Sequence, residues 1–426
     1  MTQIAQLRKP EAVVGVPLTH GRFFGLRAAT PSLVALTGSF HTEPAADCGE
    51  LLLQQLVAAL VTCGSRQRNQ FEMAHLLESR GASLSLESEM RRVTFSARAC
   101  VGDLPLVAEL LSECLREPRF DAEDFATEQA RLFAELQYRA TNPAGLAADA
   151  LSRILYPAQH PRHQADLAGQ VSQLERLTVD DVRRYHRRRF GANDLCVVVV
   201  GDIDPLATAA ELDRHLASWS PRPERASSDL YVLKNSATVV EIPTPGRENF
   251  DVALGHRLAI RCDHPDYWAL WMANHVLGAA FTSRLATAVR EEQGLTYSIR
   301  SELTKPDYEF DGHWQIDLSL SPDKLDAGLA ATRAEISRFV DGGVTPQELA
   351  AKQREAIGVF HISLATLSGL SETILFGAER GWGPDFVREF ADKVGEVSAD
   401  QLNRTVSEHL RPAELHTVIA GPFADA

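Results

Sequence analysis

The sequence lacks several features, and each absence excludes a class of protein. Its 43 Lys and Arg residues are outnumbered by 57 Asp and Glu residues, which gives a formal net charge of -14. Because so acidic a chain repels a phosphate backbone, nucleic acid is excluded as the main partner. No run approaches 18 uninterrupted apolar residues, and the N-terminus lacks a basic segment followed by an apolar one. We therefore expect a cytoplasmic protein with no membrane partner.

Cysteine is scarce, and the motifs of nucleotide binding and serine hydrolysis are missing. The six cysteines form no C-x-x-C pair and lie in apolar runs, so we expect buried free thiols in a reducing compartment. No run matches G-x-x-x-x-G-K-[ST], G-x-G-x-x-G or G-x-S-x-G. The chain therefore lacks the usual sequence support for phosphate binding, dinucleotide binding and serine-hydrolase chemistry.

Zinc ligands at helical spacing are missing as well. A zinc site on one helix needs His or Cys side chains one turn apart, so that both reach a single ion. Among the 14 histidines only His75 begins such a pattern, with Glu78 behind it, and Ser79 stands where a second His is required. We expect no metal cofactor in this chain, and an enzyme with a relocated site around His75 and Glu78 is the least favoured alternative.

What is present is the composition of a globular protein that repeats itself. The 426 residues, 45% of them hydrophobic, suffice for two to four folded units. Residues 177–201 match residues 397–421 at a constant shift of 220, and each copy runs from a Thr or Ser N-cap through a helix to an apolar strand. Upstream, Gln129 matches Gln353 at a shift of 224. Gene duplication explains both matches.

The two copies define the predicted domain organisation. Residues 218–236 hold a Pro-, Ser- and charge-rich cluster without an amphipathic period, which is typical of a linker. The sequence therefore predicts an N-terminal domain over residues 1–217 and a C-terminal domain over residues 237–426.

The fold class follows from the order of the predicted elements. Hydrophobic periodicity predicts helices over 48–63, 70–80, 104–116, 122–139, 142–155, 266–277, 324–340 and 346–360, and strands over 32–39, 83–97 with a break near 89, 195–201, 238–242, 250–254, 312–321 and 417–421. Helices and strands come in mixed order, with hairpin-like strand pairs. We predict an α+β fold of two homologous domains, each a mostly antiparallel sheet packed against helices.

Arginine is concentrated in residues 183–189, where five of the seven residues are Arg. A basic helix of this kind is also found in nucleic-acid-binding proteins. In a chain this acidic, we interpret it as a solvated helix face whose arginines pair with nearby Asp and Glu residues.

Residues 277–299 form the most informative part of the sequence. A small-residue loop opens a helix over about 283–292, which a glycine ends before a strand begins over 295–301. Arg290 falls in the last helical turn and Tyr297 early in the strand. From the residues alone, Arg290 complements the helix dipole and Tyr297 fills half-buried sheet surface.

The same segment resembles the C-terminal half of the insulinase or pitrilysin family of zinc metallopeptidases, the inverted zincins, in the branch that includes the mitochondrial processing peptidase. Further similar segments are GSFHTEP at 38–44, ESRGASL at 78–84, DHPDYW at 263–268 and TSRL at 282–285. The similarity covers nearly the whole chain, including the duplication and the linker. It implies a two-domain α+β fold and a role in peptide hydrolysis.

Active members of this family carry H-x-x-E-H on the first long helix, where two His side chains hold zinc and the Glu is the general base. The resemblance places Gln55, Ala58 and Ala59 at these three positions. Alanine has no donor atom, and the neutral amide of Gln is a poor zinc ligand beside imidazole. The position of the family's third ligand falls on Glu135, which we interpret as a solvated helix residue. The resemblance thus implies no catalytic zinc in this chain.

The Arg and Tyr of the family are kept at their seven-residue separation as Arg290 and Tyr297. In active relatives this pair grips the substrate backbone, because guanidinium and phenol donors suit a peptide carbonyl and the oxyanion that develops on it. The resemblance therefore implies a non-catalytic, substrate-binding subunit. It predicts a heterodimer with a homologous H-x-x-E-H partner that holds the zinc, the two chains enclosing a peptide-sized chamber.

Two other functions remain open at this point. One is a structural subunit, like the peptidase-derived core proteins of respiratory complexes, and the other is a protein that sequesters peptides without any protease role. The sequence does not identify the substrate. One candidate is the peptide precursor of pyrroloquinoline quinone, which a two-subunit peptidase of this family processes.

Overall fold

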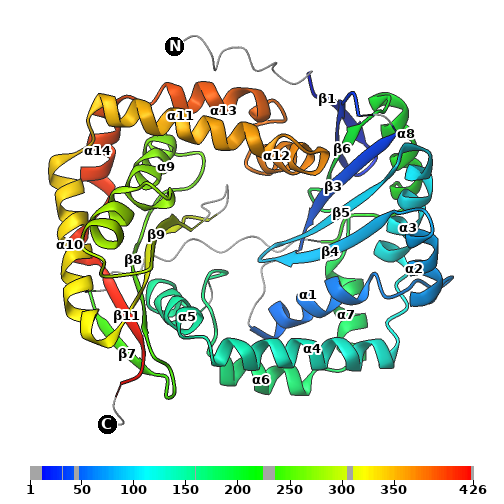
Figure 1. The fold of residues 1–426 in the computed structure, drawn as a ribbon. Helices are drawn as coiled ribbons and strands as arrows, with labels where there is room; N and C mark the ends of the chain where they lie inside the picture. The colour runs from blue at the N-terminus through cyan, green and yellow to red at the C-terminus, as the bar shows by residue number, and fades with distance from the viewer. Residues whose placement is uncertain are drawn as a thin grey trace. The chain divides into compact units, whose positions relative to one another are not determined.

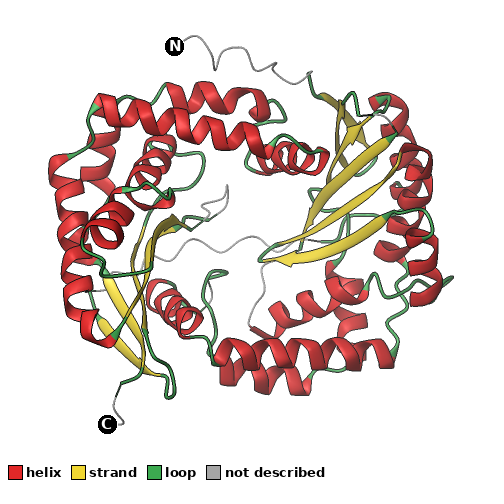
Figure 2. Ribbon diagram, in the orientation of Figure 1, coloured by secondary structure: helices red, strands yellow, loops and turns green. Residues whose placement is uncertain are grey.

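A computed structural model describes residues 12–30, 32–42, 48–158, 160–223, 236–304 and 310–423. The described residues form two compact units, each a sheet with helices (Figures 1 and 2). The first unit lies within 1–134, 168–228 and 361–389, and the second within 135–167, 229–360 and 390–426. The predicted α+β fold with two homologous domains is confirmed.

The first unit is built on a six-stranded sheet with the order β1-β2-β6-β3-β5-β4. Strand β6 pairs with β2 in parallel and with β3 antiparallel, and the other pairs are antiparallel. All six residues of β6 are buried, as expected of an apolar strand that is covered on both faces. The strands are β1 (Val14–Leu18), β2 (Gly21–Arg27), β3 (Leu33–His41), β4 (Ser83–Glu89), β5 (Arg92–Cys100) and β6 (Cys196–Gly201).

The second unit repeats this topology with one strand fewer. Its order is β7-β11-β8-β10-β9, with β7 and β11 parallel and the other pairs antiparallel. Strand by strand, this order matches β2-β6-β3-β5-β4, which supports the duplication. The strands are β7 (Val239–Pro243), β8 (Phe250–Arg257), β9 (Ser298–Leu303), β10 (His313–Leu320) and β11 (His416–Gly421).

Matched residues of the repeat make matched hydrogen bonds. The side-chain amide of Gln129 donates to the carbonyl oxygen of Leu174 at 2.7 Å, and that of Gln353 donates to the carbonyl oxygen of Val394 at 2.8 Å. Each acceptor lies in the last turn of a helix, where carbonyl groups lack partners within the helix. The duplication is therefore preserved in side-chain contacts as well as in strand order.

The α-helices largely follow the predicted pattern. Each predicted helix and strand is present, α3 with the predicted ends and most others with ends shifted by a few residues, whereas β1, β2, α6, α8, α12 and α13 were not predicted. The α-helices are α1 (Cys48–Leu60), α2 (Gln70–Glu78), α3 (Leu104–Arg116), α4 (Ala122–Ala140), α5 (Pro143–Leu155), α6 (Leu167–Arg176), α7 (Val179–Arg189), α8 (Pro205–Leu216), α9 (Tyr267–Asn274), α10 (Leu325–Gly342), α11 (Pro346–Ser363), α12 (Leu367–Glu379), α13 (Phe386–Gly395) and α14 (Ala399–His409). Among the described helices, none is by itself both long and apolar enough to cross a membrane.

Helices α5 and α12 are exchanged between the two halves of the sequence (Figure 1). Helix α5 packs on β8 and β11 of the second unit, and α12 packs on β3 and β6 of the first. Their N-caps, Asn142 and Thr366, are 224 residues apart, the same shift that relates Gln129 to Gln353. Each half of the sequence thus supplies one helix that covers the sheet of the other half.

The exchanged helices complete the apolar cores. In the first unit, Ile374 and Leu375 of α12 are packed with Val198 and Val200 of β6, and Ile374 is fully buried. In the second unit, α5 contributes to the corresponding cluster of buried residues, Ala147, Ala150, Leu151, Leu155, Tyr156, Ala253, Val418 and Ala420. Without these helices the apolar sides of both sheets would face water.

Three local features differ from the predictions. Trp219, within the predicted linker, is 3% exposed and packs edge to face against Phe40, so the first unit extends into residues 218–223; residues 224–235 lie outside the described part of the chain. The predicted helix 266–277 ends at Asn274 and passes into a π-helical segment, His275–Ala279. The thiols of Cys63 and Cys100 are free but half-buried and exposed respectively, so the expectation of burial is wrong for these two.

Candidate functional site

Helix α1 carries the three positions at which the zinc motif is degenerate. Gln55 is exposed, Ala58 is 2% exposed, and Ala59 is half-buried. Glu135, on α4, is exposed. None of these residues belongs to a group of metal-ligating side chains in the part of the chain that the structure describes, and the same is true of His75.

The sequence analysis assigned no role to Gln54, a buried glutamine next to these positions. Gln54 is fully buried, and its side-chain oxygen accepts hydrogen bonds from the hydroxyls of Thr42 at 2.9 Å and Tyr185 at 3.2 Å. Its amide nitrogen donates to the carbonyl oxygens of Glu89 and Arg92. Burial raises the pKa of Tyr185, which keeps its phenol a hydrogen-bond donor. Gln54 therefore joins α1 to α7 and to the β4–β5 hairpin.

Replacing Gln54 with Ala is expected to lower the free energy of unfolding by about 2–4 kcal/mol, because it leaves buried hydroxyls without an acceptor and opens a cavity. The neighbouring Gln55→Ala is the matched control and is expected to change stability by less than about 0.5 kcal/mol, because Gln55 is exposed. Urea unfolding of both variants measures the difference. Equal stabilities would contradict the structural role of Gln54.

The arginine-rich helix α7 borders a cavity of about 630 Å³ in the first unit. The cavity is lined by Gly49, Glu50, Leu53, Gln173, Leu177, Asp181, Arg184, Tyr185, Arg187 and Arg188. Arg184 pairs with Asp181, and Arg188 pairs with Glu50. The predicted pairing with neighbouring carboxylates is thus confirmed for Arg183, Arg184 and Arg188, and it offsets part of the positive charge of the cavity wall. Arg189 also pairs with Glu50 but is 5% exposed, so the prediction of a solvated face is wrong for this residue.

Arg290 lies in a π-helical segment, Ala286–Glu292, within the helix predicted for this region. Its guanidinium carbon is 4.0 Å from the centroid of the Phe281 ring, and its Nη2 donates to the carbonyl oxygen of Phe281 at 3.3 Å. It also pairs with Glu291 at 3.0 Å. The Phe281 side chain itself is 75% exposed. Arg290, whose side chain is 21% exposed, is therefore held by a cation–π contact with an exposed ring, which sequence reasoning did not anticipate.

The residues alone suggested that Tyr297 fills half-buried sheet surface, and the structure shows that it does not. It precedes β9 and is 94% exposed. The backbone next to it is nevertheless fixed, because the hydroxyl of Thr296 donates to the carbonyl oxygen of Ser319 at 2.6 Å and accepts from the backbone N–H of Ser298. An exposed aromatic side chain on an anchored backbone is available for contact with another molecule.

Helix α11 anchors the loop that precedes Arg290. The ammonium group of Lys352 donates to the carbonyl oxygen of Thr282 at 3.0 Å and to its hydroxyl at 2.7 Å. Arg284 forms a bidentate pair with Glu348 at 2.7 and 2.8 Å, and these hydrogen bonds hold the pKa of Glu348 below its usual value. Residues 281–297, here called the Arg290 segment, thus combine hydrogen-bond donors that are held in place with an exposed aromatic surface. This segment can bind a carbonyl or carboxylate group.

Comparison with protein families identifies both halves of the chain. Residues 37–165 match the model of the insulinase family, peptidase family M16, and residues 176–355 match that of the peptidase M16 inactive domain. The two matches do not overlap. The degenerate positions on α1 lie in the first matched region, and the Arg290 segment lies in the second.

Curated relatives are distant but extend over most of the chain. An uncharacterized zinc protease of Streptomyces coelicolor is 22% identical over 99% of this chain and 91% of its own length. The non-peptidase homolog YmxG of Helicobacter pylori is 23% identical over 85% of this chain and 83% of its own length. The names of these relatives thus include both a protease and a non-peptidase.

Solved structures show the same fold. A peptidase M16 inactive domain from Pseudomonas fluorescens superposes with a TM-score of 0.86 at 20% identity, covering 97% of this chain and 98% of its own. A protease from Helicobacter pylori gives a TM-score of 0.85 at 15% identity, covering 97% of this chain and all of its own. The chain therefore belongs to the insulinase family of peptidases, family M16, as a member that lacks the residues of the catalytic zinc motif.

Proposed function

We propose that this chain is a non-catalytic, peptide-binding subunit that acts with a homologous H-x-x-E-H zinc peptidase. The observation that carries the proposal is the contrast between the two halves of the sequence. Gln55, Ala58 and Ala59 cannot hold a catalytic metal. In the other half, Arg290 is partly exposed beside the exposed ring of Phe281, and Tyr297 is exposed on an anchored backbone.

The chemistry of the Arg290 segment suits an extended peptide. Hydrogen-bond donors on Arg290 and Tyr297 can bind a backbone carbonyl and the negative charge that develops on its oxygen during hydrolysis. The exposed ring of Phe281 offers an apolar surface beside them. Attack on the peptide bond also requires an activated water, and the partner's zinc and Glu would supply it.

The comparisons support a non-catalytic role without specifying a partner. The relative from Helicobacter pylori is named a non-peptidase homolog and aligns with most of this chain. By analogy, this chain and a catalytic chain would divide the two functions of the family between them, and peptides would bind in a chamber formed by the heterodimer.

Peptidase assays of the purified chain, alone and mixed with an H-x-x-E-H homologue from the same genome, test this proposal. The chain alone is expected to be inactive with or without added zinc, and the mixture is expected to cleave peptides faster than the homologue alone. Hydrolysis by the lone chain would refute the proposal. Peptide binding with no effect on the homologue's activity would instead favour sequestration.

A further inference from the structure

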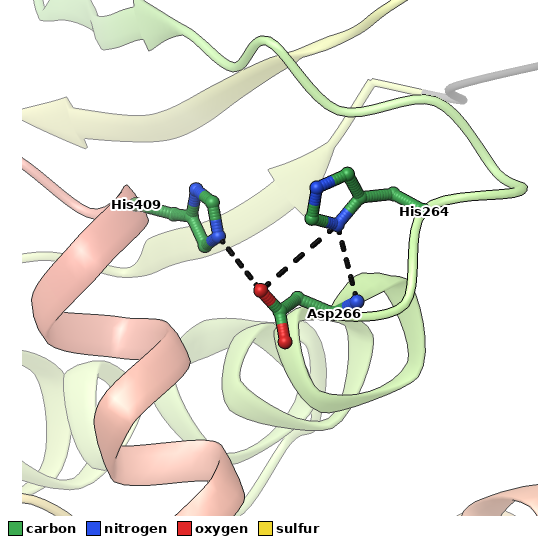
Figure 3. Close-up of side chains that lie close together, drawn as sticks. All are labelled: His264, Asp266 and His409. Carbon is green, nitrogen blue, oxygen red and sulfur yellow. Dashed lines mark hydrogen bonds and ion pairs between the residues drawn. The ribbon is translucent and has the colours of Figure 1, made fainter.

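Three potential metal ligands converge on the surface of the second unit (Figure 3). His264 lies in the loop before α9, Asp266 is the residue at its N-terminus, and His409 is the last residue of α14. The Nε2 atom of His409 is 3.1 Å from Oδ2 of Asp266, and Nδ1 of His264 is 4.0 Å from the same oxygen. One donor atom from each residue lies within 4.8 Å of the other two. Nδ1 of His264 also accepts the backbone N–H of Asp266 at 3.1 Å, so an ion bound by all three side chains would take the place of this hydrogen bond and require the His264 ring to rotate.

The neighbouring contacts orient the carboxylate toward the two imidazoles. Arg404 binds Oδ1 of Asp266 at 3.3 Å, which leaves Oδ2 directed at the histidines. Asp266 makes no side-chain capping bond to α9, so no backbone group of that helix competes for this oxygen. A ligand carboxylate held by an outer hydrogen bond is a common arrangement in metal sites.

The surroundings of the cluster are open and carry carboxylates. The side chains of His264, Asp266 and His409 are 37%, 13% and 23% exposed, so water can reach the centre of the cluster. Arg404 also approaches Glu408 at 4.0 Å, and Asp263 pairs with Arg261 at 3.4 Å. The single positive charge of Arg404 is thus shared between Asp266 and Glu408, so it does not neutralise both carboxylates.

We propose that His264, Asp266 and His409 bind one divalent transition-metal ion of the zinc type. Two imidazole nitrogens and one carboxylate oxygen match the donors that zinc prefers, whereas magnesium and calcium prefer oxygen alone. Water completes the coordination. Zinc takes the place of the proton on His409 Nε2: in a neutral imidazole that proton moves to Nδ1, and in an imidazolium it passes to solvent.

The role of this ion is structural. Its ligands join the start of α9 to the end of α14, elements separated by more than 120 residues of sequence. The site has no connection with the degenerate motif on α1, which belongs to the first unit. It is also independent of the proposed peptide-binding role, because it uses none of the same side chains.

Calorimetric titration of the full-length, chelator-treated chain with zinc chloride tests the site. The wild-type chain is expected to bind one equivalent, and bound zinc is expected to raise its melting temperature. His264→Ala and His409→Gln are each expected to weaken binding about tenfold or more. His409→Gln keeps a donor for Asp266, so its metal-free melting temperature should stay close to that of the wild type.

Replacing an exposed histidine elsewhere provides the matched control. His75→Ala, on α2, is expected to bind zinc like the wild type. Cobalt(II) should give the visible absorption of a tetrahedral site in the wild type and in His75→Ala, but not in His409→Gln. The proposal would be overturned if the wild type did not bind zinc, or if a double variant with both His264→Ala and His409→Gln bound zinc as tightly as the wild type. Zinc binding without peptide hydrolysis would leave the proposed function intact.

Discussion

Substitution of Arg290 or Tyr297 by Ala is expected to lower kcat/KM of the complex with the catalytic partner by one to three orders of magnitude. This corresponds to about 1–4 kcal/mol of transition-state stabilisation, the range found when a donor to a developing oxyanion is removed. Tyr297 is 94% exposed, the side chain of Arg290 is 21% exposed, and Lys352 anchors the preceding loop, so the variants should fold and assemble normally. Steady-state kinetics and size-exclusion chromatography measure activity and assembly separately.

Matched surface variants separate a role in peptide binding from a general effect of substitution. Arg300, on β9, has a 64% exposed side chain and pairs with Asp317, and Tyr138, on α4, is 71% exposed. Arg300→Ala and Tyr138→Ala are expected to leave turnover unchanged. Unchanged turnover in both the Arg290 and Tyr297 variants would remove the pair from the mechanism. Loss of activity through dissociation of the complex would instead place the pair at the subunit interface.

Replacing Ile374 with Ala is expected to lower the free energy of unfolding of the first unit by about 2–5 kcal/mol. Ile374 belongs to α12, is fully buried, and packs against β6 in the core of that unit. Removing its side chain loses buried apolar area and leaves a cavity in a tightly packed region. Guanidinium unfolding followed by tryptophan fluorescence gives the shift, with Trp219 as a reporter in the same unit.

Ile362 offers an identical substitution at an exposed site. Its side chain, on α11, is 76% exposed, so Ile362→Ala is expected to change stability by less than about 0.5 kcal/mol. Similar destabilisation by both variants would mean that α12 does not cover the sheet of the first unit. Because the chain contains two units, its unfolding need not be a single two-state transition. The unfolding midpoint of each variant is therefore compared with that of the wild type, measured with the same spectroscopic signal.

The predicted domains are contiguous in the sequence, whereas the compact units are not, and the exchange of α5 and α12 is one reason for this difference. The division into 1–217 and 237–426 follows the repeat, which is a property of residue order. Compact units depend instead on which apolar faces bury one another. No feature in the sequence of α12 indicates that this helix packs on β6, so the contact could not be predicted from the residues.

The candidate site was predictable only in part. The seven-residue spacing of Arg290 and Tyr297 and the loss of the zinc motif at Gln55, Ala58 and Ala59 can be read directly from the sequence. The cation–π contact with Phe281 and the anchoring by Lys352 depend on side-chain directions and on a helix 70 residues away. Gln54 was missed because buried and exposed glutamines look alike in a sequence.

The sequence by itself determined the duplication, the α+β class and the absence of catalytic zinc ligands from α1, because periodicity, repeats and side-chain chemistry are local properties. Only the tertiary structure decided that Tyr297 is exposed, that the two halves exchange a helix, and that His409 lies beside His264 and Asp266. These three outcomes depend on contacts between residues far apart in the chain. Such contacts form in the arrangement that buries the most apolar surface and leaves the fewest buried polar groups without hydrogen bonds in the whole unit.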